Sequence, residues 1–226
     1  MINVGIEQSV GVSLTNPAPR SILSGNNLPR VSSLSKVSDR IPLLSAFEVK
    51  CLLLQISYME TGSNVAAIDG DRLGQYATSE YLLKKYGYKD DSGWTGLDGV
   101  DEQSIFLDTP SVQDKILETY IVENYTKLIQ ADAIRANDTK AVVAGMLAVA
   151  YQFQDAENPS LIQTGTISNE VLSLIQNEAN SNYNVVKAKI WRDNGNQQDS
   201  KNRPAGLFFN AGKYAIQNLA ANYTNT

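Results

Sequence analysis

The fold of this chain is decided by residues 140–153, which read KAVVAGMLAVAYQF. A helix over this stretch is apolar on nearly every face, and such helices lie inside a core rather than at its surface. Its small residues, among them Ala144, Gly145 and Ala148, allow other helices to approach closely. We therefore expect a mainly α-helical protein with this segment as its central helix.

Two amphipathic helices are predicted upstream of this segment. One should begin after Thr109-Pro110, a capping hydroxyl followed by a proline at the first helical position, and should run to about Gln130. The other should end at Thr61-Gly62. Its buried stripe is predicted from apolar residues that recur at spacings of three and four, namely Leu44, Phe47, Cys51, Leu54 and Tyr58.

A short helix is predicted over residues 81–86, with Thr78 or Ser79 as its N-cap and Gly87 as its stop. Towards the C-terminus the sequence predicts a polar, turn-rich loop at residues 192–204 and three helices, at residues 169–177, 185–191 and 213–223.

The domain organisation is indicated by a change in composition near residue 42. Residues 1–42 are rich in Ser, Asn and Pro and show no helical or strand period, which predicts an extended, irregular N-terminal arm. A chain of 226 residues can bury one substantial core, so residues 43–226 are predicted to form one helical domain. Within it we place the core at residues 46–153 and a C-terminal helical extension at residues 165–226.

The composition disfavours several kinds of partner. The 19 Lys and Arg and 24 Asp and Glu give a net charge of -5, which disfavours nucleic-acid binding. No apolar run approaches the roughly 20 residues that span a bilayer, so we expect no membrane insertion. The first residues lack the pattern of a secretory signal, and exit from a cell would then occur by lysis or on a particle.

The absence of histidine and the presence of a single cysteine, Cys51, limit the chemistry further. They exclude Ser-His-Asp and Cys-His catalysis, disulfides and the usual zinc sites, so we expect no metal and no cofactor. Glycoside cleavage is the common hydrolysis that needs carboxyl groups alone.

Glu60 is the candidate for such chemistry, because it lies at the end of an apolar helix in Tyr58-Met59-Glu60-Thr61-Gly62. Partial burial and the negative end of the helix dipole both raise the pKa of a carboxyl group towards that of a general acid. A glutamate at a helix end is also commonly a solvated surface residue. The local sequence leaves both interpretations open.

Two motifs around this glutamate carry a resemblance. Glu60-Thr61-Gly62 followed by Gly74-Gln75-Tyr76 resembles the Glu-Ser/Thr-Gly and Gly-x-Tyr-Gln motifs of goose-type lysozymes, lytic transglycosylases and their phage relatives. The similarity is good over residues 46–153 and looser over residues 185–223. Within this group, the chain resembles especially the lysozyme-like virion proteins of contractile-tailed phages, above all those that infect cyanobacteria. Further matching stretches are Tyr86-Gly87-Tyr88, Trp94-Thr95-Gly96, Ala144-Gly145-Met146-Leu147, Trp191-Arg192-Asp193 and Phe209-Asn210-Ala211-Gly212-Lys213-Tyr214.

The resemblance implies a lysozyme-like helical domain and a role for each motif. Glu60 would protonate the glycosidic oxygen between two peptidoglycan sugars, and Gln75 and Tyr76 would line the glycan groove. The substrate N-acetyl group or a positioned water can complete this reaction, so a second carboxylate is not strictly needed.

Three more residues are candidates for the substrate site. Asp69 and Asp71 are the nearest carboxylates in sequence that could position a water, although aspartates beside Gly70 also simply form a turn. Trp94 could stack on a sugar ring, although a loop tryptophan more often packs on its own core.

Two departures from the family pattern affect the functional interpretation. Ala77 stands where the Gly-x-Tyr-Gln motif ends in glutamine, and Tyr151 stands where relatives usually carry a histidine. These losses favour a tail or baseplate structural protein of the virion, made in the host cytoplasm, with other tail or baseplate proteins as partners and with peptidoglycan cleavage weakened or lost. The alternative is an active tail-associated muramidase or lytic transglycosylase that opens host peptidoglycan locally.

Overall fold

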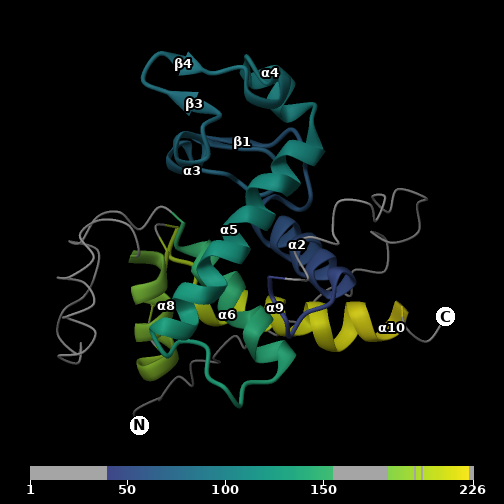
Figure 1. Ribbon diagram of the computed structural model, residues 1–226, viewed down its shortest axis with the longest axis vertical. Helices are drawn as coiled ribbons and strands as arrows, with labels where there is room; N and C mark the ends of the chain where they lie inside the picture. The colour runs from purple at the N-terminus through teal and green to yellow at the C-terminus, as the bar shows by residue number, and fades with distance from the viewer. Residues whose placement is uncertain (1–39, 155–182, 196, 200, 224–226) are drawn as a thin grey trace, which may run out of the picture. The chain divides into compact units, whose positions relative to one another are not determined.

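Figure 1 shows the computed structural model of the chain, which describes residues 40–154, 183–195, 197–199 and 201–223. All of them belong to one compact unit, residues 34–226. The described part is mainly helical, as predicted. The predicted arm, apart from residues 40–42, and the predicted helix at residues 169–177 lie outside the described residues.

The described elements are helices and two small hairpins. In the hairpins, β1 (Ile68–Asp69) pairs antiparallel with β2 (Arg72–Leu73), and β3 (Lys89–Asp90) pairs antiparallel with β4 (Gly93–Trp94). The helical elements are α2 (Ala46–Thr61), α3 (Glu80–Lys85), the 3-10 turn η2 (Leu97–Gly99), α4 (Gln103–Leu107), α5 (Pro110–Gln130), α6 (Lys140–Gln152), α8 (Tyr183–Asn194), α9 (Ala205–Tyr214), the π-helical η5 (Ala215–Ala220) and α10 (Ala221–Tyr223).

The helix α6 is the centre of the core, as its sequence predicts. It lies against α2, α5, α8 and α9 (Figure 1), and ten consecutive residues from Val143 to Gln152 are buried. The helices α6 and α9 approach each other closely, because a Cβ on Gly212 would lie 2.4 Å from the carbonyl oxygen of Ala144. The small residues therefore permit the contact that the sequence led us to expect.

The helix α2 has a local start and stop that its sequence explains, but a buried face that differs from the predicted one. Ser45 and Glu48 form a reciprocal capping box at its start, and Gly62 ends it in the left-handed conformation, with φ of 65°. The predicted stripe is right for Leu44 and Cys51, which are buried. It is wrong for three residues, because Phe47 is 36% exposed and Leu54 and Tyr58 are only half-buried.

The reason for this error is the breadth of the apolar surface on α2. Residues 49–56 read VKCLLLQI, which offers several stripes of helical period. Because α2 packs against α5, α6, α9 and η5 at once, contacts from several sides select the face. The apolar residues buried within the helix are Val49, Cys51, Leu52, Leu53 and Ile56.

Other predicted helix ends are confirmed with small corrections. The helix α5 runs from Pro110 to Gln130 as expected, but Thr109 does not cap it, because its hydroxyl donates to the carbonyl of Ile105 at 2.7 Å. Ser79 caps α3 through its hydroxyl, which accepts from the Leu82 amide.

The C-terminal helices are longer than predicted. The helix α8 continues to Asn194, three residues beyond its expected end. Helical structure then begins again at Ala205, directly after Pro204, and not at Lys213. The apolar residues of 205–212 explain this earlier start, because Ala205, Phe208 and Ala211 are buried, at the spacing of one helix face.

A second, smaller hydrophobic cluster surrounds the β3–β4 hairpin. It contains Tyr88, Val100 and Phe106, and it is completed by Val112 and Ile116 from the first turns of α5. The later turns of α5 belong to the main core, so this helix connects the two clusters (Figure 1). Among the described helices, none is both long and apolar enough to cross a membrane.

Candidate functional site

The turn that carries Gln75 and Tyr76 is held by the side chain of one residue of α5. Gln113 accepts a hydrogen bond from the Gln75 amide through its Oε1, at 2.8 Å, and donates to the carbonyl of Phe106 through its Nε2, at 2.9 Å. Gly74 leaves room for this side chain, because a Cβ there would lie 2.4 Å from the Gln113 Oε1. Gly74 also has a φ of 76°, which favours glycine.

The predicted proximity of the two motifs is present in the structure. The hydroxyl of Thr61, next to Glu60, donates to the carbonyl of Gln75 at 2.7 Å. From the other side, the hydroxyl of Tyr151 on α6 donates to the carbonyl of Tyr76 at 2.8 Å. The end of α2 and the 74–76 turn are therefore joined to the central helix.

The side chains of Gln75 and Tyr76 end on Asp114 of α5. The Tyr76 hydroxyl donates to the Asp114 Oδ1 at 2.5 Å, and the Gln75 Nε2 donates to the same oxygen at 3.0 Å. Lys50 of α2 contacts the Asp114 Oδ2 at 2.6 Å, and its side chain is 9% exposed. This polar network links α2, the turn and α5, so the side chains that the resemblance assigns to a glycan groove serve here as cross-links.

Tyr76 in particular is inside the core. The residue is 1% exposed, and burial, together with the neighbouring charge of Asp114, raises the pKa of its hydroxyl well above the ordinary value. A hydroxyl in this position stays protonated and donates to the carboxylate. It does not lie on a surface that a glycan could contact.

Glu60 lies in the last turn of α2 with a fully buried side chain, which is 0% exposed. Its Oε2 lies 2.9 Å from the Nη2 of Arg203, an ion pair without hydrogen-bond geometry, and neither carboxylate oxygen accepts a hydrogen bond from a described residue. Burial raises the pKa of Glu60 above its ordinary value, and the positive charges of Arg203, Arg72 and Lys201 oppose this shift only in part.

Arg203 is placed by the loop that precedes α9 and by α6. Its Nε donates to the Asp199 Oδ2 at 2.7 Å, and its carbonyl accepts from the Nε2 of Gln152 at 2.8 Å. The guanidinium carbon lies 4.8 Å from the centre of the Phe208 ring. These contacts fix the cation over Glu60, so in this conformation the carboxyl group cannot reach a substrate.

The two candidate aspartates lie on the β1–β2 hairpin. Asp69 is exposed and contacts the Nζ of Lys201, and this hydrogen bond holds the pKa of Asp69 below its ordinary value. Asp71 is exposed in the turn directly after Gly70, which has a φ of 63°. Lys201 thus brings the Asp69 strand and the loop of Arg203 together.

Trp94 lies in β4 and packs on the small cluster. Its ring lies 5.5 Å from that of Phe106, centre to centre, with the planes tilted by 33°. The Nζ of Lys89 lies 4.9 Å from the centre of the Trp94 ring. The structure thus shows the packing role for this half-buried residue.

Arg203 and Asp114 are the residues that sequence reasoning missed. A buried carboxylate needs a cation near it, and the sequence shows two cationic residues, Lys201 and Arg203, in the polar loop at residues 192–204. No local pattern assigns either of them to Glu60, because the loop and the end of α2 meet only in the folded chain. Asp114 gives no signal beyond following Gln113 on a predicted helix.

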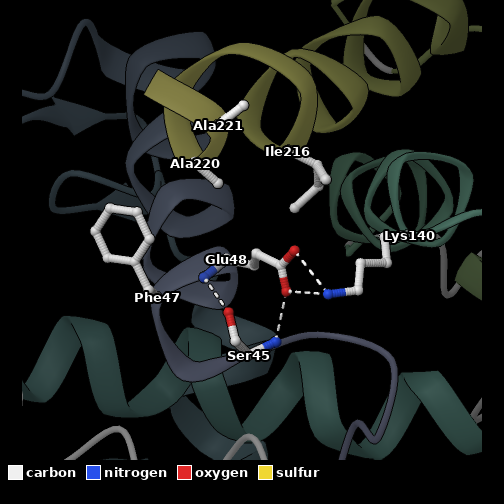
Figure 2. A pocket seen from close by; sticks show the side chains of 7 residues that line it. All are labelled: Ser45, Phe47, Glu48, Lys140, Ile216, Ala220 and Ala221. Atoms are coloured by element: carbon white, nitrogen blue, oxygen red, sulfur yellow. Dashed lines mark hydrogen bonds and ion pairs between the residues drawn. The ribbon is translucent and has the colours of Figure 1, made fainter. Parts of the chain in front are cut away.

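A separate surface pocket lies between the start of α2, the start of α6 and the last helical turns. The pocket has a volume of about 570 Å³. Figure 2 shows Glu48 among its lining residues, between Ser45 and Lys140, and the Glu48 Oε1 lies 2.9 Å from the lysine Nζ. Its charged groups neutralise each other, and none of the predicted site residues lines it. The remaining lining is apolar and consists of Phe47, Ile216, Ala220 and Ala221.

Comparison of the chain with family models, curated proteins and solved structures gives no significant match. Among the described residues, no group of Cys, Asp and Glu side chains is arranged to hold a metal ion. The chemistry available at the site is therefore that of Glu60 and its neighbours.

Proposed function

We propose that this chain is a structural protein of a phage tail or baseplate, built on a lysozyme-like helical domain, with peptidoglycan cleavage weakened or lost. The burial of Glu60 beneath Arg203 carries the proposal. A general acid must come within about 2.6–3.2 Å of the oxygen that it protonates, and a side chain without exposed surface does not. Glu60 thus keeps the position of the acid in the chain, but a substrate cannot reach its side chain.

The network around Asp114 supports the same conclusion. Gln75 and Tyr76 donate to this carboxylate, and Lys50 neutralises it. Residues used in this way stabilise the domain rather than a bound glycan. A domain kept for its architecture would have contacts of this kind, with other tail or baseplate proteins as its partners in the virion.

A second candidate function is an active tail-associated muramidase or lytic transglycosylase. It is favoured by the raised pKa of Glu60, because general-acid cleavage of a glycosidic bond requires a protonated carboxyl group and a raised pKa favours the protonated form. Peptidoglycan would be its substrate, and Glu60 would protonate the leaving-group oxygen.

Zymography on peptidoglycan tests the two candidates against each other. The wild type is compared with Glu60→Gln and with Glu123→Gln, a matched change at an α5 residue paired with Lys85. No clearing by any of the three supports the structural function. Clearing by the wild type and by Glu123→Gln, but not by Glu60→Gln, supports the enzyme, and equal clearing by all three rules out Glu60 as its acid.

Incorporation into particles tests the structural function directly. We expect the full chain to be recovered with purified tails, and a chain lacking residues 1–42 to be lost from them, because the arm is proposed to wrap on neighbouring subunits. Normal incorporation of the shortened chain would show that the arm is not the anchor.

A further inference from the structure

Two of the acids that the sequence singles out, Glu60 and Asp69, are contacted by cations from one short segment. Arg203 pairs with Glu60, and Lys201 pairs with Asp69. The acids come from different elements, the end of α2 and the strand β1. A segment of three residues thus contacts two acids of the predicted site.

We propose that residues 201–203, the clasp, form an autoinhibitory contact that covers Glu60 and can be released to expose it. This inference rests on the second candidate function, in which Glu60 is the general acid. The clasp explains why Glu60 is present at the end of α2 and yet is closed to solvent.

The conformation of the clasp is held mainly by the side chain of Asp199, which accepts hydrogen bonds from it. The Oδ1 of Asp199 accepts from the amides of Lys201 and Arg203, each at 2.9 Å, and its Oδ2 accepts from the Arg203 Nε at 2.7 Å. The loop is closed by a bridge between Gln198 and Pro204. Arg203 therefore keeps a carboxylate partner when it leaves Glu60, which lowers the cost of opening.

The contacts that would break on opening are few. The Lys201–Asp69 pair is exposed on both sides, and exposed ion pairs contribute little because water and salt weaken them. On the inner side the clasp is held by Glu60, by the carbonyl of Met59 at 3.3 Å, by Gln152 and by the Phe208 ring, whose centre lies 4.8 Å from the guanidinium carbon of Arg203. The Glu60 oxygens make no hydrogen bond to a described residue, so the inner contact does not fully satisfy this carboxylate.

Chemical labelling of the full chain tests whether the clasp covers Glu60. A water-soluble carbodiimide with a small amine labels accessible carboxyl groups, and mass spectrometry reports each site. In the wild type we expect Glu60 to be labelled at least tenfold more slowly than the exposed Glu102. In Lys201→Ala and in Arg203→Gln, Glu60 labelling should rise severalfold.

Two controls separate release of the clasp from general loosening. Lys115→Ala removes a comparable exposed ion pair, with Asp98, and should leave Glu60 labelling unchanged. Asp138, whose side chain is 7% exposed and paired with Arg192, should stay unlabelled in every variant that is folded. If Arg203→Gln fails this criterion, Lys201→Ala alone decides the test, because it removes only a surface contact.

Peptidoglycan clearing by the same variants gives the second readout. Faster Glu60 labelling together with gained clearing supports both the clasp and the enzyme. Faster labelling without clearing supports the clasp as a cover and overturns the enzymatic candidate. Unchanged Glu60 labelling in both variants overturns the clasp, whatever the clearing shows.

Discussion

Gly212 of α9 gives the sharpest quantitative prediction, because it lies against the backbone of the central helix. A Cβ at this position would lie 2.4 Å from the carbonyl oxygen of Ala144 and 2.7 Å from the Cα of Gly145. These distances are about 1 Å shorter than ordinary van der Waals contact. Both atoms belong to the backbone of α6, so Gly212→Ala requires the two helices to separate.

The cost follows from two opposing terms. Overpacking in a tight core costs about 1–3 kcal/mol, and we expect the upper end here because no flexible side chain can move away. Replacing a helical glycine by alanine returns about 1 kcal/mol of helix propensity. The net effect of Gly212→Ala should be a loss of about 2 kcal/mol in the free energy of unfolding.

Gly206 provides a matched control in the same helix. A Cβ there would meet no atom within 4 Å, so Gly206→Ala should stabilise the protein by about 0.5 kcal/mol through helix propensity alone. Urea unfolding of the full chain, followed by circular dichroism, should give a midpoint that is about 1 M lower for Gly212→Ala than for Gly206→Ala. Equal midpoints would refute the argument that the two backbones touch.

Three further predictions concern the polar groups. Burial raises the pKa of Glu60, so the stability that this residue contributes is present below the unfolded pKa of about 4.5 and is lost as pH rises through the folded pKa. Glu60→Gln should therefore raise Tm at pH 7.5 and raise it less near pH 4.5. A gain in Tm that is independent of pH would contradict this prediction. Tyr76→Phe removes a donor to the Asp114 carboxylate and should cost about 1.5–3 kcal/mol in urea unfolding, whereas an unchanged midpoint would show that the bond contributes nothing. Asp138→Asn weakens a bidentate ion pair with Arg192 and should lower the free energy of unfolding by about 2 kcal/mol in the same measurement. An unchanged free energy of unfolding would show that this pair does not stabilise the protein.

The candidate site divides into a part that the sequence predicts and a part that it does not. The resemblance implies that Glu60 and the 74–76 segment serve one groove, and the structure joins the end of α2 to this segment through the hydroxyl of Thr61. The direction of the side chains is not contained in the motif. The Tyr76 hydroxyl turns into the core, where the Asp114 carboxylate accepts its hydrogen bond and Lys50 neutralises that carboxylate.

Local signals determined the end of α2, the start of α5 and the central helix by themselves. Gly62 ends α2 because it adopts a left-handed φ without a Cβ penalty, and Pro110 begins α5 because its ring fixes a helical φ. The small residues of α6 predicted close helix approach because contact distance depends on side-chain size. Each of these effects acts within a turn of the chain or at a single residue.

Only the tertiary structure decided the buried face of α2 and the partner of Glu60. Several stripes of α2 are apolar, and the contacts with α5, α6, α9 and η5 together selected one of them. The cation over Glu60 comes from a loop far along the sequence, and that loop is positioned by Asp199 and Gln152. Burial and ion pairing depend on which segments meet in space, so the sequence could offer Glu60 as a candidate acid, but it could not predict the closure of Glu60 by Arg203.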